Sequence, residues 1–257
     1  MAGFGVLLLG YGLAGRVFHA PLIAATQGLQ IRAVVTGNPE RQAQAAADLP
    51  EARIIADPEV ALDDLTGIDL VVIAGANRTH VPQALTAIAK HRHVVIDKPI
   101  AGSADEARRI ADAAAGAGVT VHAFQNRRWD SDFLTIREIA SSGVIGKLHR
   151  FESRIERMRI TPRGNWRESP DPADLGGVLL DFGAHLVDQA LMLMGPVISV
   201  DARARSIRDP EASDDDMTIV LEHLSGATTT LVGSQAAACG GPRFLLLGEE
   251  GAVRVDG

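Results

Sequence analysis

The sequence has little sulfur and few aromatic side chains. Its 257 residues include one cysteine, Cys239, together with one tyrosine and two tryptophans. A single cysteine cannot form an internal disulfide, and without a second one nearby it cannot anchor a metal cluster. We therefore expect no redox chemistry at sulfur and interpret Cys239 as a small buried filler.

The chain also lacks a basic segment, a long apolar run and a cluster of metal ligands. Its formal net charge of -7 is spread along the sequence, so nothing predicts nucleic acid as a partner. The apolar run from Val6 to Leu9 is too short for a signal peptide or a membrane span, which predicts a cytoplasmic protein with no membrane partner. His91 and His93 have no third ligand beside them, so we expect no bound metal.

The first half of the chain alternates short apolar runs with helical stretches. Strands are predicted at 6–9, 30–35, 53–55, 70–74, 94–96 and 120–123. Most are apolar at consecutive positions, which is typical of strands covered by helices on both faces of a parallel sheet. Asn38, Asp57 and Ser103 each stand where a helix N-cap is expected. This pattern predicts an α/β Rossmann fold, a doubly wound parallel sheet, over residues 1–123.

The second half has a different character from about residue 124. Helices are predicted near 126–142 and 177–194, and strands at 148–158, 198–205, 217–224, 228–233, 243–247 and 252–255. Strands joined by short turns favour an α+β domain with a largely antiparallel open sheet over residues 124–257. The acidic run Asp214–Asp216 is interpreted as a solvated turn.

A glycine-rich turn follows the first predicted strand. Residues Gly10–Gly15 read GYGLAG, a G-x-G-x-x-G pattern in which the glycines permit a tight turn and the close approach of a pyrophosphate. Such a pattern is weak by itself and could be a turn without a ligand. Its place between a strand and a helix at the start of a βαβ series favours dinucleotide binding.

The end of the second predicted strand bears on the choice of cofactor. NAD-preferring sites place a carboxylate there for the ribose 2′-hydroxyl, and this sequence has none. Thr36 and Asn38 can instead hydrogen-bond a phosphate, and Arg41 can bind it with the parallel N–H donors of its charged guanidinium. We therefore expect NADP as the preferred cofactor, or else NAD; that Arg41 is only a solvated residue of a first helical turn remains equally open.

Four blocks in order are the most specific feature. They are Gly10–Gly15 with the following His19–Pro21, then 74–80 (AGANRTH), Asp97–Pro99 (DKP) and 177–185 (GVLLDFGAH). With these blocks the chain resembles the glucose-fructose oxidoreductase/inositol dehydrogenase (Gfo/Idh/MocA) family over nearly its whole length. Segment 126–133 (NRRWDSDF) is most similar to the NADP-dependent scyllo-inositol dehydrogenase branch.

Three departures from the family pattern stand out. Ala76 replaces the usual Pro, Asp97 replaces the usual Glu, and the chain stops at Gly257 although members of the family usually continue considerably further. We therefore expect a C-terminal domain that is shortened. A final strand at 252–255 would leave an unpaired sheet edge, which predicts a homo-oligomer formed through this sheet or an incomplete chain.

The resemblance implies hydride transfer between a nicotinamide cofactor and a secondary alcohol or carbonyl of an inositol, sugar or sugar derivative. Such chemistry needs a proton acceptor and a cation beside the reacting oxygen. Lys98, Asp181 and His185 resemble the catalytic residues of the family, and we expect them to converge on one substrate oxygen where the two domains meet. By spacing alone, Asp181 and His185 could equally be a helix-surface ion pair.

The remaining expectations concern binding residues and a competing function. The predicted cofactor-binding residues are Gly10, Gly12, Leu13, Ala14, Gly15, Thr36, Asn38, Arg41, Ala74, Asn77, His80 and Lys98. The predicted substrate-binding residues are Arg127, Trp129, Trp166, Arg167, Asp181 and His185. His80 could instead cap its helix, and the Arg and Trp residues could pack a domain interface. The competing function is a non-catalytic dinucleotide-binding sensor of the same fold.

Overall fold

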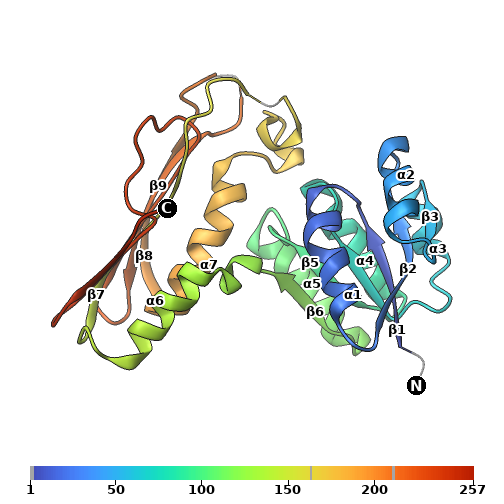
Figure 1. The fold of residues 1–257 in the computed structure, drawn as a ribbon, viewed down its shortest axis with the longest axis horizontal. Coiled ribbons are helices and arrows are strands. Elements are labelled where there is room, and N and C mark those ends of the chain that lie inside the picture. Colours follow the sequence, from blue (N-terminus) through green and yellow to red (C-terminus); the bar gives the residue numbers. More distant parts are fainter. Residues whose placement is uncertain (1–2, 163, 210–211) are drawn as a thin grey trace. The chain divides into compact units, whose positions relative to one another are not determined.

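The computed structural model describes residues 3–162, 164–209 and 212–257. The chain forms two compact units, Met1–Phe124 and Gln125–Gly257, and each is described by itself (Figure 1).

The first unit is built on a parallel sheet of six strands. Along the chain these are β1 (Phe4–Leu9), β2 (Leu29–Val35), β3 (Arg53–Ile55), β4 (Leu70–Ile73), β5 (His93–Asp97) and β6 (Val121–Phe124). Their order in the sheet is β3-β2-β1-β4-β5-β6, and every pairing is parallel. The predicted doubly wound sheet is confirmed. The carboxyl ends of β1 and β4, which flank the reversal of strand order, are where such sheets bind ligands.

Helices cover both faces of this sheet. They are η1 (Ala14–His19), α1 (Ala20–Ala25), α2 (Pro39–Asp48), α3 (Pro58–Asp63), η2 (Asn77–Thr79), α4 (His80–Ala89) and α5 (Ala104–Ala117). One apolar core lies under α1 and α2 and another under α3, α4 and α5. The predicted caps form, because Asn38, Asp57 and Ser103 each accept a hydrogen bond from a backbone N–H of the first helical turn. Each cap contributes about 1 kcal/mol.

The second unit combines a mixed, mostly antiparallel sheet with helices. Its elements are η3 (Asn126–Trp129), α6 (Ser131–Ser142), β7 (Leu148–Glu156), η4 (Trp166–Glu168), η5 (Pro172–Asp174), η6 (Leu179–Gly183), α7 (Ala184–Met194), β8 (Val197–Arg205), β9 (Asp216–His223), β10 (Thr228–Ser234), β11 (Phe244–Gly248) and β12 (Ala252–Val255). The strand order is β12-β11-β7-β10-β9-β8, in which only β7 and β10 run parallel. The predicted sheet is confirmed.

The core of the second unit lies between this sheet and helices α6 and α7. Phe133, Phe151 and Phe244 are fully buried and their rings lie against one another, each contributing about 1.5–3 kcal/mol by its burial. The stretch Pro172–Met194 is long and apolar enough to cross a membrane by length and composition, but half of it is buried inside the unit, as expected for a core helix.

Two expectations about single residues are wrong. Cys239 is exposed and not a buried filler, because it lies in the irregular segment between β10 and β11, where no sheet face covers it. Asp215 is only 3% exposed, so the acidic run is not a solvated turn. The backbone N–H groups of Ile207 and Arg208 donate to its carboxylate, and such hydrogen bonds allow a charge to be buried.

Candidate active site

The glycines of the Gly10–Gly15 turn are needed for its shape. Gly10 has a φ of +103°, and a Cβ atom there would lie 2.7 Å from the Ala74 carbonyl oxygen at the end of β4. A Cβ atom on Gly15 would overlap the carbonyl oxygen of Gly10. At Gly12, by contrast, the nearest group to such a Cβ would be the Arg41 guanidinium, 3.6 Å away. The turn is thus closed on the side of the sheet and open at Gly12, which fits the approach of a pyrophosphate.

A helical segment starts directly after this turn. Leu13 is the residue before the π-helical segment η1, which begins at Ala14. The backbone N–H groups at the start of a helix point outward along its axis and favour anions. Arg16 does not add a free charge here, because its Nε donates to Asp48 Oδ2 at 3.0 Å.

The end of β2 presents polar groups and a guanidinium. Thr36 is buried, and its carbonyl oxygen accepts a hydrogen bond from Gln42. The side-chain oxygen of Asn38 accepts from the backbone N–H of Arg41 at 3.0 Å, which fixes the first turn of α2. The Arg41 side chain is exposed, and none of the described residues accepts a hydrogen bond from it. Arg41 therefore remains available to a ligand that lies over Gly12.

A second turn of the first unit holds Lys98. It follows Asp97, the last residue of β5, whose carboxylate accepts from the backbone N–H of Lys98 at 2.9 Å. Behind it, His80 is 1% exposed and its Nδ1 lies 2.8 Å from the Pro99 carbonyl oxygen. A carbonyl can only accept, so Nδ1 carries the proton. Burial lowers the pKa of His80, which keeps the ring neutral. Asn77, on η2, is buried as well.

The second unit contains a polar pocket. It is lined by Arg159, Asn165, Arg167, Glu168, Gly177, Val178, Asp181, Arg208, Asp214 and Gln235. Arg167 and Asp181 were expected at a substrate site, and the structure brings them together here. Most of the other lining residues come from irregular loops, and only Val178 has an aliphatic side chain.

Hydrogen bonds around Gly177 assemble one wall of this pocket. The N–H of Gly177 donates to the Arg167 carbonyl oxygen at 2.8 Å, and the N–H of Leu179 donates to Asp214 Oδ2 at 2.7 Å. Gly177 has a φ of +92°, and a Cβ atom there would overlap the Asp214 carboxylate. Burial raises the pKa of Asp214, although these backbone N–H groups oppose the shift. This wall therefore requires glycine at position 177.

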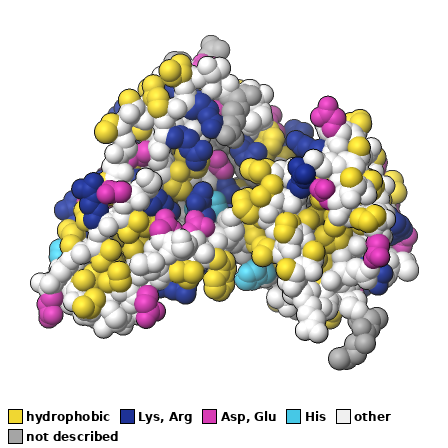
Figure 2. Space-filling view, in the orientation of Figure 1, with side chains coloured by type: hydrophobic (Ala, Val, Ile, Leu, Met, Phe, Trp, Pro, Cys, Tyr) yellow, Lys and Arg dark blue, Asp and Glu magenta, His cyan; other side chains and the backbone are white. Residues whose placement is uncertain are grey.

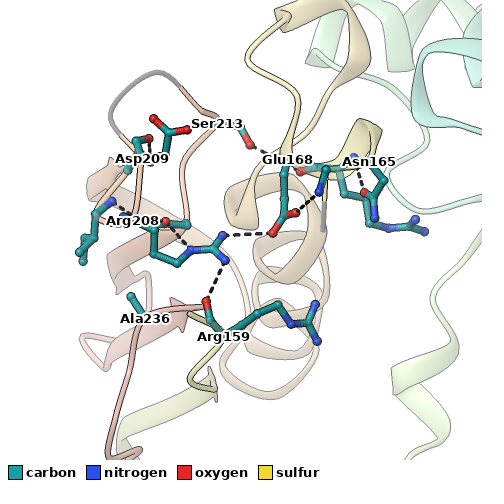
Figure 3. Close-up of polar contacts among 12 residues, drawn as sticks. Arg159, Asn165, Glu168, Arg208, Asp209, Ser213 and Ala236 are labelled. Atoms are coloured by element: carbon teal, nitrogen blue, oxygen red, sulfur yellow. Dashed lines mark hydrogen bonds and ion pairs between the residues drawn. The ribbon is translucent and has the colours of Figure 1, made fainter. Parts of the chain in front are cut away.

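Arg208, whose side chain is 11% exposed, joins the loop between β8 and β9 to the segment between β7 and η6 (Figure 3). Arg208 donates to Asp215 at 2.8 Å, to Glu168 at 3.1 Å and to the Arg159 carbonyl oxygen at 3.0 Å. Burial lowers the pKa of Arg208, but the hydrogen bonds to the two carboxylates outweigh it and the net shift is upward. Burial likewise raises the pKa of Asp215, and its hydrogen bonds outweigh that effect so that the net shift is downward. Arg208 is thus charge-neutralised and structural.

The other predicted residues of the second unit lie on its helices and turns. Asp181 is in the π-helical segment η6, and His185 follows one turn later in α7, where it is 8% exposed. The guanidinium carbon of Arg167 lies 4.2 Å from the centre of the Trp166 ring. Arg127 pairs with Asp130 at 2.9 Å, and Trp129 is 73% exposed on η3. Of the predicted substrate-binding residues, only Arg167 and Asp181 line the pocket, and Arg127, Trp129, Trp166 and His185 are not among its lining residues.

Sequence reasoning missed several residues that build this pocket, which are Arg159, Glu168, Arg208, Asp214 and Gln235. Glu168 adjoins the predicted Trp166 and Arg167, and Asp214 belongs to the acidic run that was interpreted as a solvated turn. The other three stand in segments without periodicity, and they meet these two residues only because the loops fold onto one another.

Comparison with known proteins agrees with both units. Residues 4–125 match the model of an oxidoreductase family with an NAD-binding Rossmann fold, and residues 133–254 match the GFO/IDH/MocA C-terminal domain. The uncharacterized oxidoreductase YdgJ of Escherichia coli is 36% identical over 95% of this chain, which spans 68% of YdgJ. The NADP(+) scyllo-inositol 2-dehydrogenase IolW of Bacillus subtilis is 31% identical over 95% of this chain, which spans 66% of IolW.

Solved structures agree as well. The crystal structure of an NAD-binding protein from Listeria innocua superposes with a TM-score of 0.91 at 30% identity, covering 100% of this chain and 72% of that one. The predicted family and the expectation of an enzyme are confirmed. The chain belongs to the Gfo/Idh/MocA family and is an oxidoreductase with an NAD-binding Rossmann fold.

Proposed function

We propose that this protein transfers a hydride between NADP(H) and a secondary alcohol or carbonyl of an inositol, sugar or sugar derivative. The observation that carries the proposal is the pocket around Asp181, whose side chains are polar apart from Val178. A ligand rich in hydroxyl groups suits such a lining, whereas an apolar ligand would leave its polar groups unpaired. The similarity to IolW, an NADP(+) scyllo-inositol 2-dehydrogenase, supports the same substrate class.

The residues of the first unit fit a bound dinucleotide. Of the three glycines of the Gly10–Gly15 turn, Gly12 is the one at which an added Cβ atom would meet no backbone atom, and the turn is followed by a helix N-terminus, where a pyrophosphate would be held by backbone N–H groups. Ala74, Asn77 and Lys98 would hold the nicotinamide end, since they follow the ends of β4 and β5. When bound, the nicotinamide accepts or supplies the hydride.

Preference for NADP follows from the end of β2. No carboxylate stands there to pair with a ribose hydroxyl, and the Arg41 guanidinium lies near Gly12 with none of the described residues as its hydrogen-bond partner. A 2′-phosphate would neutralise it through charge-assisted hydrogen bonds. Thr36 and Asn38 would add neutral donors on the same side.

Lys98, Asp181 and His185 supply the proton chemistry in this proposal. His185 accepts the proton of the substrate hydroxyl, and Lys98 stabilises the negative charge that develops on the same oxygen. Asp181 orients the substrate hydroxyl or the imidazole. The support is the chemistry of the three residue types, which lie within the ranges that match the family, Lys98 in 4–125 and Asp181 and His185 in 133–254. A dinucleotide sensor would have no need of a proton acceptor.

The direct test is an assay of a panel of cyclitols and aldoses with NADP+ and with NAD+, followed by the absorbance of the reduced cofactor. We expect turnover with at least one member and a higher kcat/KM with NADP+. Tight binding of the dinucleotide without turnover of any member would instead favour the sensor.

A further inference from the structure

The charges that line the pocket of the second unit are unevenly compensated. Arg208 is paired with Asp215 and Glu168, and Asp214 accepts the N–H of Leu179. Arg208 and its two carboxylate partners are thus paired inside the protein. The same pocket is also lined by the carboxylates of Asp181 and Asp214 and by the guanidinium groups of Arg159 and Arg167.

Both arginines are held in place by their backbones and not by an ion pair. The backbone of Arg159 donates to the Gln235 carbonyl oxygen at 2.8 Å and accepts from Arg208 at 3.0 Å. Its side chain extends away from Arg208 (Figure 3). At Arg167, the N–H donates to Asn165 and the carbonyl oxygen accepts from Gly177.

The two guanidinium groups are half-buried, and no described residue accepts a hydrogen bond from either one. The Arg167 guanidinium lies over the face of the Trp166 ring. The pocket also contains a buried acceptor, since the side-chain oxygen of Gln235 has no hydrogen-bond partner among the described residues. Lys and Arg side chains gather over the loops of the second unit between β7 and α7 (Figure 2).

Charged groups removed from water without a partner cost free energy, and a guanidinium is best satisfied by the two oxygens of a carboxylate or a phosphate. We propose that Arg159 and Arg167 bind an anionic group of the substrate, so that the enzyme acts on sugar acids or sugar phosphates in preference to neutral polyols. Gln235 accepts a hydrogen bond from a hydroxyl group of the same substrate. This inference rests on the proposed function only in taking the Asp181 pocket as the substrate site.

The test measures binding separately from turnover. The affinity of the full chain with NADP+ is determined by calorimetry for glucose, galactose and inositol, and for glucuronate, galacturonate, glucose 6-phosphate and inositol phosphate. We expect an acidic compound to bind at least about 10-fold more tightly than its neutral counterpart, as a charged hydrogen-bond pair allows. Comparing the uronates with the phosphates decides which anion is bound.

The variants Arg159→Gln and Arg167→Gln should each lose most of that preference for the acidic compound, while Arg159→Lys should retain part of it. Arg109→Gln, at an exposed position of α5 outside the pocket, is the matched control and should behave as the wild type. Melting temperatures verify that each variant is folded.

Equal affinity of the wild type for every acidic compound and its neutral counterpart would overturn the inference, as would an anion preference that both glutamine variants retain. Oxidation of neutral polyols with no anion preference would overturn it and leave the proposed function standing. Anion binding without turnover of any compound would contradict the proposed function and leave the anion site standing.

Discussion

The replacement Gly177→Ala tests how the pocket around Asp181 is assembled. Two costs follow from the structure. The backbone at Gly177 has a φ of +92°, which costs a residue with a Cβ atom about 1–2 kcal/mol. The added methyl group would also overlap the Asp214 carboxylate. If that carboxylate moves, it loses its hydrogen bond to the Leu179 N–H, worth about 1.5–3 kcal/mol for a charged acceptor.

We therefore expect Gly177→Ala to lower the free energy of unfolding by about 2.5–5 kcal/mol, the sum of the two terms. Because Asp181 donates its backbone N–H to the Gly177 carbonyl oxygen, kcat/KM should fall as well. The assays are denaturant unfolding followed by circular dichroism, and steady-state kinetics on an identified substrate.

Two comparisons separate the backbone cost of the positive φ from the cost of the overlap with Asp214. Gly226 has a φ of +82° with nothing within 4 Å of an added Cβ atom, so Gly226→Ala should cost only the backbone term of about 1–2 kcal/mol. In an Asp214→Ala background, Gly177→Ala should cost no more than Gly226→Ala, because the overlap is gone. Equal costs for Gly177→Ala and Gly226→Ala in the otherwise unchanged protein would refute the proposed role of the Asp214 contact.

Three further outcomes are expected. Arg41→Ala should weaken the binding of NADP far more than that of NAD, measured as dissociation constants, and equal losses would show that Arg41 does not contact the 2′-phosphate. The pKa of Asp215 is lowered in the folded state, so its contribution to stability is present above the unfolded pKa of about 3.9 and is lost as the pH falls through the folded pKa. Asp215→Asn should therefore flatten the acid limb of a stability–pH curve, and an unchanged limb would contradict this assignment. We also propose that a second copy of the chain covers the sheet face on which Val220 is 40% exposed; sedimentation should then show a dimer that Val220→Glu dissociates, whereas a fully active monomer would rule it out.

Much of the fold could be predicted because its signals are local. The strand and helix boundaries of the first unit depend on apolar runs and on caps such as Asn38 and Ser103, which act within a single turn. The glycine turn could be predicted for the same reason, since Gly10 and Gly15 each avoid a clash with nearby backbone atoms.

The pocket could not be predicted, because its residues meet only through tertiary contacts. Arg208 stands in a loop without any pattern, yet it joins Glu168, Asp215 and the Arg159 carbonyl oxygen. Asp214 was interpreted as part of a solvated turn, whereas its carboxylate accepts a hydrogen bond from Leu179, which belongs to a distant segment. The π-helical form of η1 and η6 likewise has no signature in spacing.

The identity of the proton acceptor is the central claim, and a single variant tests it most directly. His185→Ala is compared with the wild type in single-turnover oxidation of an identified substrate at saturating NADP+, with the dissociation constant of the cofactor measured in parallel. Loss of the general base should lower turnover by about 10²–10⁴-fold while the cofactor dissociation constant stays nearly the same. Turnover within about 10-fold of the wild type, below the range expected for a lost general base, would show that His185 is not the proton acceptor.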